Sequence, residues 1–233
     1  MLTGTRRNRF LLWGISSLII VGVVGWILST NLRQAHFLPP VSSDISASPG
    51  LGDWPMAQRD LSHSAFEVEG NSPAGGRLKW SFKTSAAIFS SPAVVGDYLY
   101  LSTGDKRVIS LNVTSGEIQW EHHVSGPIHS SPAVAGNFVY VGLRDGSVIS
   151  LQKDTGVKHW QYKTGNIVDS SPGVYKGVLY VGGADGRLYA LDAATGKERW
   201  NYLTRGRITS DPAVNQEVVA VVTEDSNLYI IEL

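Results

Sequence analysis

The chain lacks cysteine altogether, and it carries little charge for its length. Without cysteine, its 233 residues cannot form a disulfide scaffold, a thiolate zinc site, a cysteine nucleophile or an acylated lipobox cysteine. Charged residues make up 17% of the chain and hydrophobic residues 42%, which excludes a disordered chain held open by charge. The length is sufficient for one domain, or two small ones, with a buried core.

A strongly basic surface is also absent. The first 35 residues contain Arg6, Arg7, Arg9 and Arg33 but no acidic residue, although the formal net charge of the chain is zero. The remainder therefore holds 16 of the 20 basic residues and all 20 acidic ones. This mildly acidic balance predicts that nucleic acid is not a partner.

Residues 10–28 (FLLWGISSLIIVGVVGWIL) contain no charge. As a helix they would span ~28 Å, close to the hydrocarbon thickness of a bilayer. The three arginines of residues 1–9 precede this run, so the positive-inside rule keeps residues 1–9 cytoplasmic and exports the rest. We expect a single-pass signal anchor in the cytoplasmic membrane. The alternative is secretion after signal-peptide cleavage, although the run is long and no A-x-A site follows it.

Residues 29–50 are rich in serine, proline and small residues and show no period. They are typical of a flexible linker between the membrane and the folded part of the chain. The remaining residues, 51–233, are predicted to form a single repeat domain.

The repeat has a period of 40 residues, which Trp80, Trp120, Trp160 and Trp200 mark. A Ser-Ser-Pro or Ser-Asp-Pro triplet follows each tryptophan after ten residues, and further columns recur in register. The recurring aspartates are Asp105, Asp145, Asp185 and Asp225, and the recurring glycines are Gly116, Gly156 and Gly196. A fixed period of this length with several matching columns indicates a repeat architecture.

Within one period the apolar residues follow strand rules. In the third, short β-prone runs at 170–174, 178–181, 187–191 and 199–202 are separated by glycine-containing turn signals. Four short strands per ~40 residues are the unit of a β-propeller blade. The sequence therefore predicts an all-β fold of four four-stranded blades, preceded by one transmembrane helix.

Residues 190–200 (ALDAATGKERW) match the A-x-D-x-x-T-G-x-x-x-W motif of PQQ-like β-propeller repeats, and residues 150–160 and 110–120 keep parts of it. The domain thus resembles quinoprotein dehydrogenases and their non-enzymatic relatives. Among the latter it is similar to the propeller lipoprotein of the bacterial outer-membrane protein assembly machine. The resemblance implies that the four tryptophans and the three glycines dock one blade onto the next. It also implies a ring of about seven or eight blades, more than this chain contains.

One column varies inside an otherwise constant frame. Phe89, His129, Asp169 and Thr209 each stand nine residues after a tryptophan and directly before a serine. Such a position is typical of a channel-lining or top-face site, and equally of an unconstrained surface position. We treat these four residues as the candidate site.

Other side chains could be ligands but have structural explanations. The recurring aspartates lie in turn sequences, and no Asp-x-Asp-x-Asp run surrounds them. His122 and His123 are adjacent in a predicted strand and point to opposite faces, so they cannot easily bind one ion. We predict no metal site.

No catalytic motif is present, so no catalytic residue is predicted. Similarity to quinoproteins would imply PQQ, calcium and a catalytic carboxylate, but the cysteine pair that often covers the cofactor is missing. The sequence therefore favours a non-enzymatic binding, scaffold or sensor module for a protein partner at the cell envelope, without a cofactor. The alternative is a degenerate or partial PQQ-dependent dehydrogenase.

The last repeat stops after a third strand, whereas residues 78–84 have the pattern of an outermost strand with no blade of their own. We expect residues 78–84 to pair with residues 227–231. This contact closes a four-bladed ring if it forms within one chain, and an eight-bladed ring if a homodimer forms it. Without the contact, the blades would form an open arc.

Overall fold

The computed structural model describes residues 55–56 and 76–233, and all of these belong to one compact unit. The predicted cytoplasmic segment, signal anchor and linker, residues 1–50, lie outside the described residues. No helix among the described residues is long and apolar enough to cross a membrane.

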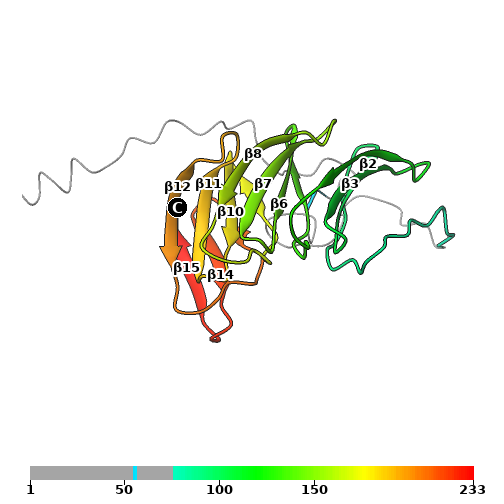
Figure 1. The fold of residues 1–233 in the computed structure, drawn as a ribbon. Helices are drawn as coiled ribbons and strands as arrows, with labels where there is room; N and C mark the ends of the chain where they lie inside the picture. The colour runs from blue at the N-terminus through cyan, green and yellow to red at the C-terminus, as the bar shows by residue number, and fades with distance from the viewer. Residues whose placement is uncertain (1–54, 57–75) are drawn as a thin grey trace, which may run out of the picture. The chain divides into compact units, whose positions relative to one another are not determined.

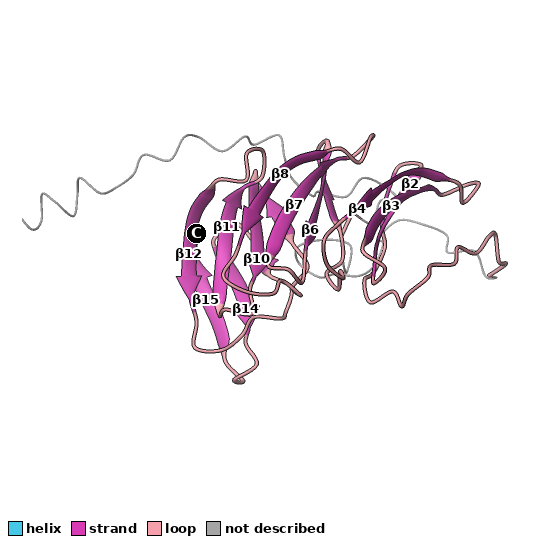
Figure 2. Cartoon of the chain, viewed as in Figure 1, coloured by secondary structure: helices cyan, strands magenta, loops and turns pink. Residues whose placement is uncertain are grey.

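The described residues form fifteen strands and no helix (Figure 2). Consecutive strands pair antiparallel in four sheets, which follow one another in chain order (Figure 1). The first sheet contains β1 (Ala93–Val95), β2 (Tyr98–Thr103), β3 (Arg107–Asn112) and β4 (Ile118–His123). The second contains β5 (Ala133–Ala135), β6 (Phe138–Gly142), β7 (Ser147–Gln152) and β8 (Lys158–Lys163). The third contains β9 (Gly173–Tyr175), β10 (Val178–Gly182), β11 (Arg187–Asp192) and β12 (Glu198–Leu203). The fourth contains β13 (Ala213–Val214), β14 (Val218–Val222) and β15 (Leu228–Glu232).

The sheets contact one another through their first strands, in the order β1, β5, β9 and β13. These short strands form the inner edge of each sheet, and β4, β8 and β12 form the outer edge. This arrangement is that of successive propeller blades, as the 40-residue period predicts.

Burial differs between the strands of a sheet. The two middle strands are almost wholly buried, as in β7 and β10, because β-branched and aromatic residues pack on both faces. The outer strands β4 and β8 bury little besides one tryptophan each. The core therefore lies between neighbouring sheets, and β4 and β8 each cover it with one tryptophan.

At the ends of the repeat, the expected third-strand stop of the last repeat is confirmed, whereas the expected pairing of its edge is not seen in the described part of the chain. The fourth sheet has three strands among the described residues, and β15 pairs with β14. Residues 78–84 are not in a strand, so the predicted pairing with residues 227–231 is not formed within the described chain. The third-period run predicted at 170–174 is also shorter, because β9 begins at Gly173.

Candidate functional site

The four residues of the variable column precede the innermost strands. Phe89, His129, Asp169 and Thr209 lie in the segments that lead into β1, β5, β9 and β13. Because these strands are neighbours in the same order, the first three column residues meet side by side. Thr209 is exposed in the corresponding place before the fourth sheet.

The first three column residues form a continuous cluster. The rings of Phe89 and His129 are 4.4 Å apart between centroids and inclined by 41°. His129 Nδ1 lies 3.7 Å from Asp169 Oδ1. Three neighbouring sheets thus contribute an aromatic ring, an imidazole and a carboxylate to one place.

Arg144 completes the cluster, and the sequence interpretation missed it. Its Nε lies 3.1 Å from Asp169 Oδ1, although it belongs to the β6–β7 turn of the preceding sheet. A backbone hydrogen bond holds this turn against the segment before β5, because the N–H of Arg144 donates to the carbonyl of Pro127 at 3.3 Å. A signal was available: the position before each recurring aspartate also varies, being occupied by Gly104, Arg144, Ala184 and Glu224.

The cluster combines a partly buried ion pair, Arg144 with Asp169, with the exposed ring of Phe89. Asp169 Oδ1 is buried and faces Arg144 and His129 without a well-aligned hydrogen bond. The side chain of Arg144 is 37% exposed, and Phe89 is 62% exposed. The guanidinium at one end of this cluster can bind a hydrogen-bonding group of a ligand, and the exposed ring at the other end can contact an apolar group.

The residues predicted to dock the blades lie at the interfaces between sheets. Trp80, Trp120 and Trp160 cover Gly116, Gly156 and Gly196 respectively. Their indole N–H groups donate to backbone carbonyls of the next sheet, at 2.9, 2.8 and 2.9 Å. Gly196 has a φ of +71°, and a Cβ there would lie 2.6 Å from the Trp160 ring, so only glycine fits. Trp200 is partly buried and packs 6.0 Å from Tyr180 within its own sheet.

The repeated fold and docking geometry agree with a comparison against protein families. The model of the family described as outer membrane protein assembly factor BamB matches residues 64–169 and 163–232. The chain belongs to this BamB family. A comparison with curated proteins found no match.

Solved structures share the BamB-like fold. BamB from Moraxella catarrhalis is 22% identical with a TM-score of 0.60, over 66% of this chain and 49% of that one. Quinohemoprotein alcohol dehydrogenase from Comamonas testosteroni is 20% identical with a TM-score of 0.66, over 76% and 36%. The computationally designed Ika4 protein is 16% identical with a TM-score of 0.62, over 68% and 99%. This chain thus spans about half the length of the BamB structure that it matches.

The quinoprotein likeness raises the question of PQQ and calcium. Among residues 55–56 and 76–233, no three His, Asp or Glu side chains gather where they could hold a metal ion. The described residues thus show no cluster of carboxylates to which a calcium ion could be assigned. His123 is exposed and faces Glu121, whose Oε1 lies 3.2 Å from its Nε2, while His122 is half-buried.

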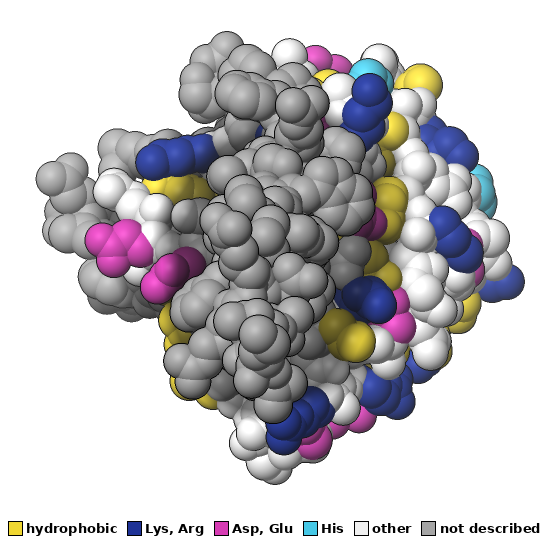
Figure 3. Space-filling model, turned by 90° about the vertical axis from the view of Figure 1, so that its left-hand side faces the viewer, with side chains coloured by type: hydrophobic (Ala, Val, Ile, Leu, Met, Phe, Trp, Pro, Cys, Tyr) yellow, Lys and Arg dark blue, Asp and Glu magenta, His cyan; other side chains and the backbone are white. Residues whose placement is uncertain are grey.

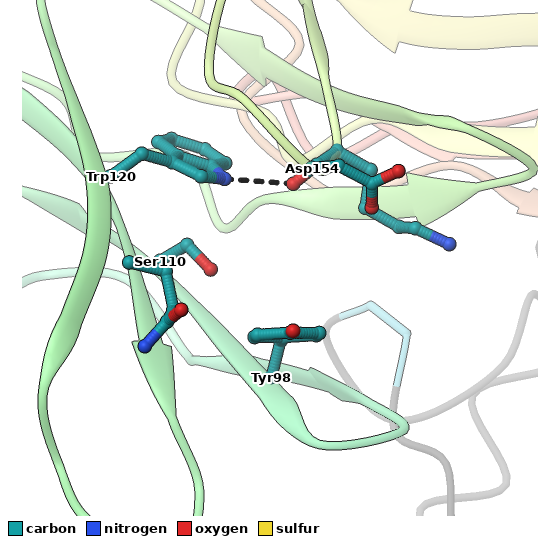
Figure 4. A pocket seen from close by; sticks show the side chains of 6 residues that line it. Tyr98, Ser110, Trp120 and Asp154 are labelled. Carbon is teal, nitrogen blue, oxygen red and sulfur yellow. Dashed lines mark hydrogen bonds between the residues drawn. The ribbon is translucent and has the colours of Figure 1, made fainter.

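A cavity of about 120 Å³ lies between the first two sheets, beside the docking residue Trp120 (Figure 4). Its lining consists of Tyr98, Ser110, Gln119, Trp120, Lys153 and Asp154. One interface further on, Phe138 and His159 take the positions of Tyr98 and Gln119 and stack at 4.7 Å. The blade interfaces of this BamB-like chain therefore differ from one another in how completely they are filled.

Charged side chains of both signs are intermixed on the face that Figure 3 shows. Lys and Arg lie scattered among Asp and Glu there instead of forming one basic patch.

Proposed function

We propose that this BamB-family chain is a non-enzymatic binding module that acts as a scaffold for protein partners at the cell envelope. Membership of a family described as an assembly factor supports a role in holding other proteins. Trp80, Trp120 and Trp160 pack on glycines of the next sheet, and the repeated serines hydrogen-bond between neighbouring sheets. The residues that vary between repeats are left to provide specificity.

The observation that carries the proposal is the cluster of Phe89, His129, Asp169 and Arg144. An exposed aromatic ring and a partly exposed arginine, joined through His129 and Asp169, are residue types that dominate protein–protein binding energy. The half-buried carboxylate of Asp169 orients Arg144 through its buried Oδ1, so the guanidinium is preorganised and binding loses less side-chain entropy.

Site-specific photocrosslinking in cells tests the scaffold role. A benzophenone amino acid at Phe89 in the full chain should capture a discrete protein, and the same group at Val157, which is also exposed, should not. Arg144→Ala should lower the capture at Phe89 several-fold. Equal capture at both positions, or no effect of Arg144→Ala, would contradict the assignment of this surface.

Anchoring and orientation are part of the same proposal. Residues 10–28 would hold the protein in the cytoplasmic membrane with residues 1–9 inside and the propeller outside. Protease added to the outer side of the membrane should then digest the repeat domain and leave residues 1–9 protected. A mature protein that begins after residue 28 would favour the alternative of a cleaved signal peptide.

The dehydrogenase alternative is directly testable. PQQ and calcium added to the purified protein should cause no spectral shift and no alcohol- or sugar-dependent dye reduction. The fold shared with quinohemoprotein alcohol dehydrogenase does not by itself carry over an activity.

We also propose that a second copy of the chain is a partner. Among the described residues no strand pairs with the second edge of β15, and Leu228 and Ile230 of this strand are 64% and 58% exposed. Such an edge promotes aggregation unless another strand covers it. Residues 78–84 of another copy would provide that strand.

A further inference from the structure

The interfaces between neighbouring sheets can be compared position by position, because the repeat has no insertion. Between the second and third sheets, Tyr162 of β8 meets Tyr189 of β11 edge to face, with ring centroids 5.7 Å apart. Between the third and fourth, Tyr202 of β12 meets Tyr229 of β15 at 6.2 Å. A pair of tyrosines fills the outer part of both interfaces.

The first interface lacks this pair. The residues 40 positions earlier are His122 of β4 and Ile149 of β7, and both are smaller than tyrosine. A cavity of about 290 Å³ that both residues line lies at this interface. Its lining consists of His122, His123, Val124, Ser125, Leu143, Ile149, Lys158 and Gln161.

The cavity has an apolar floor and a polar, open rim. Leu143 and Ile149 form the floor and are each 2% exposed. Ser125, Lys158 and Gln161 lie at the rim and are exposed. This combination suits one amphipathic ring with its polar end toward solvent, and the volume is at the lower limit for ligand pockets.

Of the two groups that hold the tyrosine hydroxyl in the second interface, one has an equivalent that lines the cavity, Ser125, and the other has an equivalent bonded to Ser125, Asp145. In the second interface, Tyr189 donates its hydroxyl hydrogen to Asp185, and the backbone N–H of Gly165 donates to the Tyr189 oxygen at 3.2 Å. The equivalent residues in the first interface are Asp145 and Ser125, which hydrogen-bond to each other. An incoming phenol would therefore meet Ser125, whose hydroxyl is both a donor and an acceptor, at the cavity rim.

We propose that this cavity, between β4 and β7, binds a tyrosine side chain of a protein partner. The partner ring occupies the place that Tyr189 and Tyr229 occupy in the next two interfaces. The proposal rests on the scaffold function proposed above and adds a second contact, separate from Phe89 and Arg144. Aromatic side chains seated in such pockets are typical anchors of protein–protein interfaces.

NMR titration of the full chain with N-acetyltyrosinamide tests the proposal. The expected shifts are confined to His122, Ser125 and the Ile149 methyl groups, and N-acetylalaninamide at equal concentration should cause none. Shifts of equal size with both probes, or shifts elsewhere only, would overturn the proposal.

Two variants test the same proposal by removing the cavity in one case and by creating a second one in the other. Ile149→Tyr installs in the first interface the ring that the other two carry, and it should weaken probe binding at least tenfold. Tyr189→Ile is the converse variant, and it should create a second binding site beside Tyr162. Unchanged binding to a folded Ile149→Tyr protein, or no new site in a folded Tyr189→Ile protein, would contradict the proposal.

The same variants separate this proposal from the scaffold function. If Ile149→Tyr lowers partner capture by the photocrosslinker at Phe89 as well as probe binding, the partner uses the cavity. Capture that persists in Ile149→Tyr, together with loss of probe binding, would overturn the protein-partner assignment and leave the scaffold function intact.

Discussion

Trp160 shows how several constraints fix one side chain. It is 9% exposed, its ring covers Gly196 of the next sheet, and its indole N–H donates to the carbonyl of Ala193. Tyr140 packs 5.8 Å away between centroids and donates its hydroxyl to the same carbonyl. Neither a smaller aromatic residue nor an aliphatic one satisfies all of these contacts.

Trp160→Ala should lower the free energy of unfolding by ~3–5 kcal/mol, because it removes a buried aromatic ring and leaves a cavity between two sheets. Urea unfolding followed by circular dichroism measures the loss. Trp200→Ala is the matched control and should cost less, since Trp200 is only partly buried. A loss below ~1 kcal/mol for Trp160→Ala would mean that this ring is not a packing residue.

His122 has a lowered pKa because it is partly buried and because the ammonium of Lys158 adds a positive charge nearby. Lys158→Met should therefore raise the pKa of His122 toward its ordinary value of about 6.5 without reaching it, since burial remains. NMR pH titration of the imidazole measures this shift. Lys163→Met is the control and should leave the pKa of His122 unchanged.

The same shift has a consequence for stability. The unfolded chain protonates His122 at a higher pH than the folded chain does, so stability falls as the pH drops below about 6.5. In Lys158→Met this fall should become shallower. A steeper fall, or a lower His122 pKa, would contradict the assigned role of Lys158.

At the scale of elements, a chain of hydrogen bonds joins the segments before the inner strands. The backbone N–H of Ser91 donates to Ser131 Oγ at 2.9 Å, and that of Ser131 donates to Ser171 Oγ at 3.0 Å. The N–H of Ser171 donates to Asp211 Oδ1 at 2.6 Å. In the second, third and fourth triplets the middle residue thus satisfies a backbone donor of the preceding triplet.

Ser171→Ala should remove the acceptor of the buried Ser131 N–H and speed hydrogen exchange at that amide at least tenfold. Native-state exchange followed by NMR measures the rate, and the amide of Ser91, which uses Ser131 Oγ, serves as the internal control. Equal acceleration at both amides would indicate general loosening and contradict the specific role of Ser171.

Individual strands could be predicted well where their residues are β-prone and their partners adjoin them in sequence. Runs at 178–181 and 187–191 correspond to β10 and β11. The predicted run at 170–174 begins too early, since β9 starts only at Gly173. Pro172 has no N–H, and the N–H of Ser171 bonds to Asp211 instead of to a neighbouring strand. Residues 78–84 have a strand pattern but no ladder among the described residues, so pattern alone does not make a strand.

At the scale of the molecule, the period predicts which sheets are neighbours but not how their variable residues meet. Phe89, His129 and Asp169 could be selected because they share one column. Arg144 belongs to another column, and its contact with Asp169 depends on how a turn of one sheet lies over the next. The 290 Å³ cavity was missed for a related reason: it results from two smaller residues on different strands that face each other.

The edge of the fourth sheet leads to a prediction about assembly. β15 hydrogen-bonds to β14 on one side, while Leu228 and Ile230 remain exposed. Trp80 already docks on Gly116 of the first sheet as Trp120 does on Gly156, so residues 78–84 occupy the place of an outer strand. A second copy that adds this segment to β15 covers the edge and continues the order of sheets.

Lys79→Cys combined with Leu228→Cys should therefore give a disulfide-linked dimer under oxidising conditions, seen by non-reducing electrophoresis. Lys79→Cys with Val157→Cys is the matched control and should stay monomeric. An internally crosslinked monomer would show that the contact forms within one chain, and no crosslink there or at adjacent positions would show that the edge stays open.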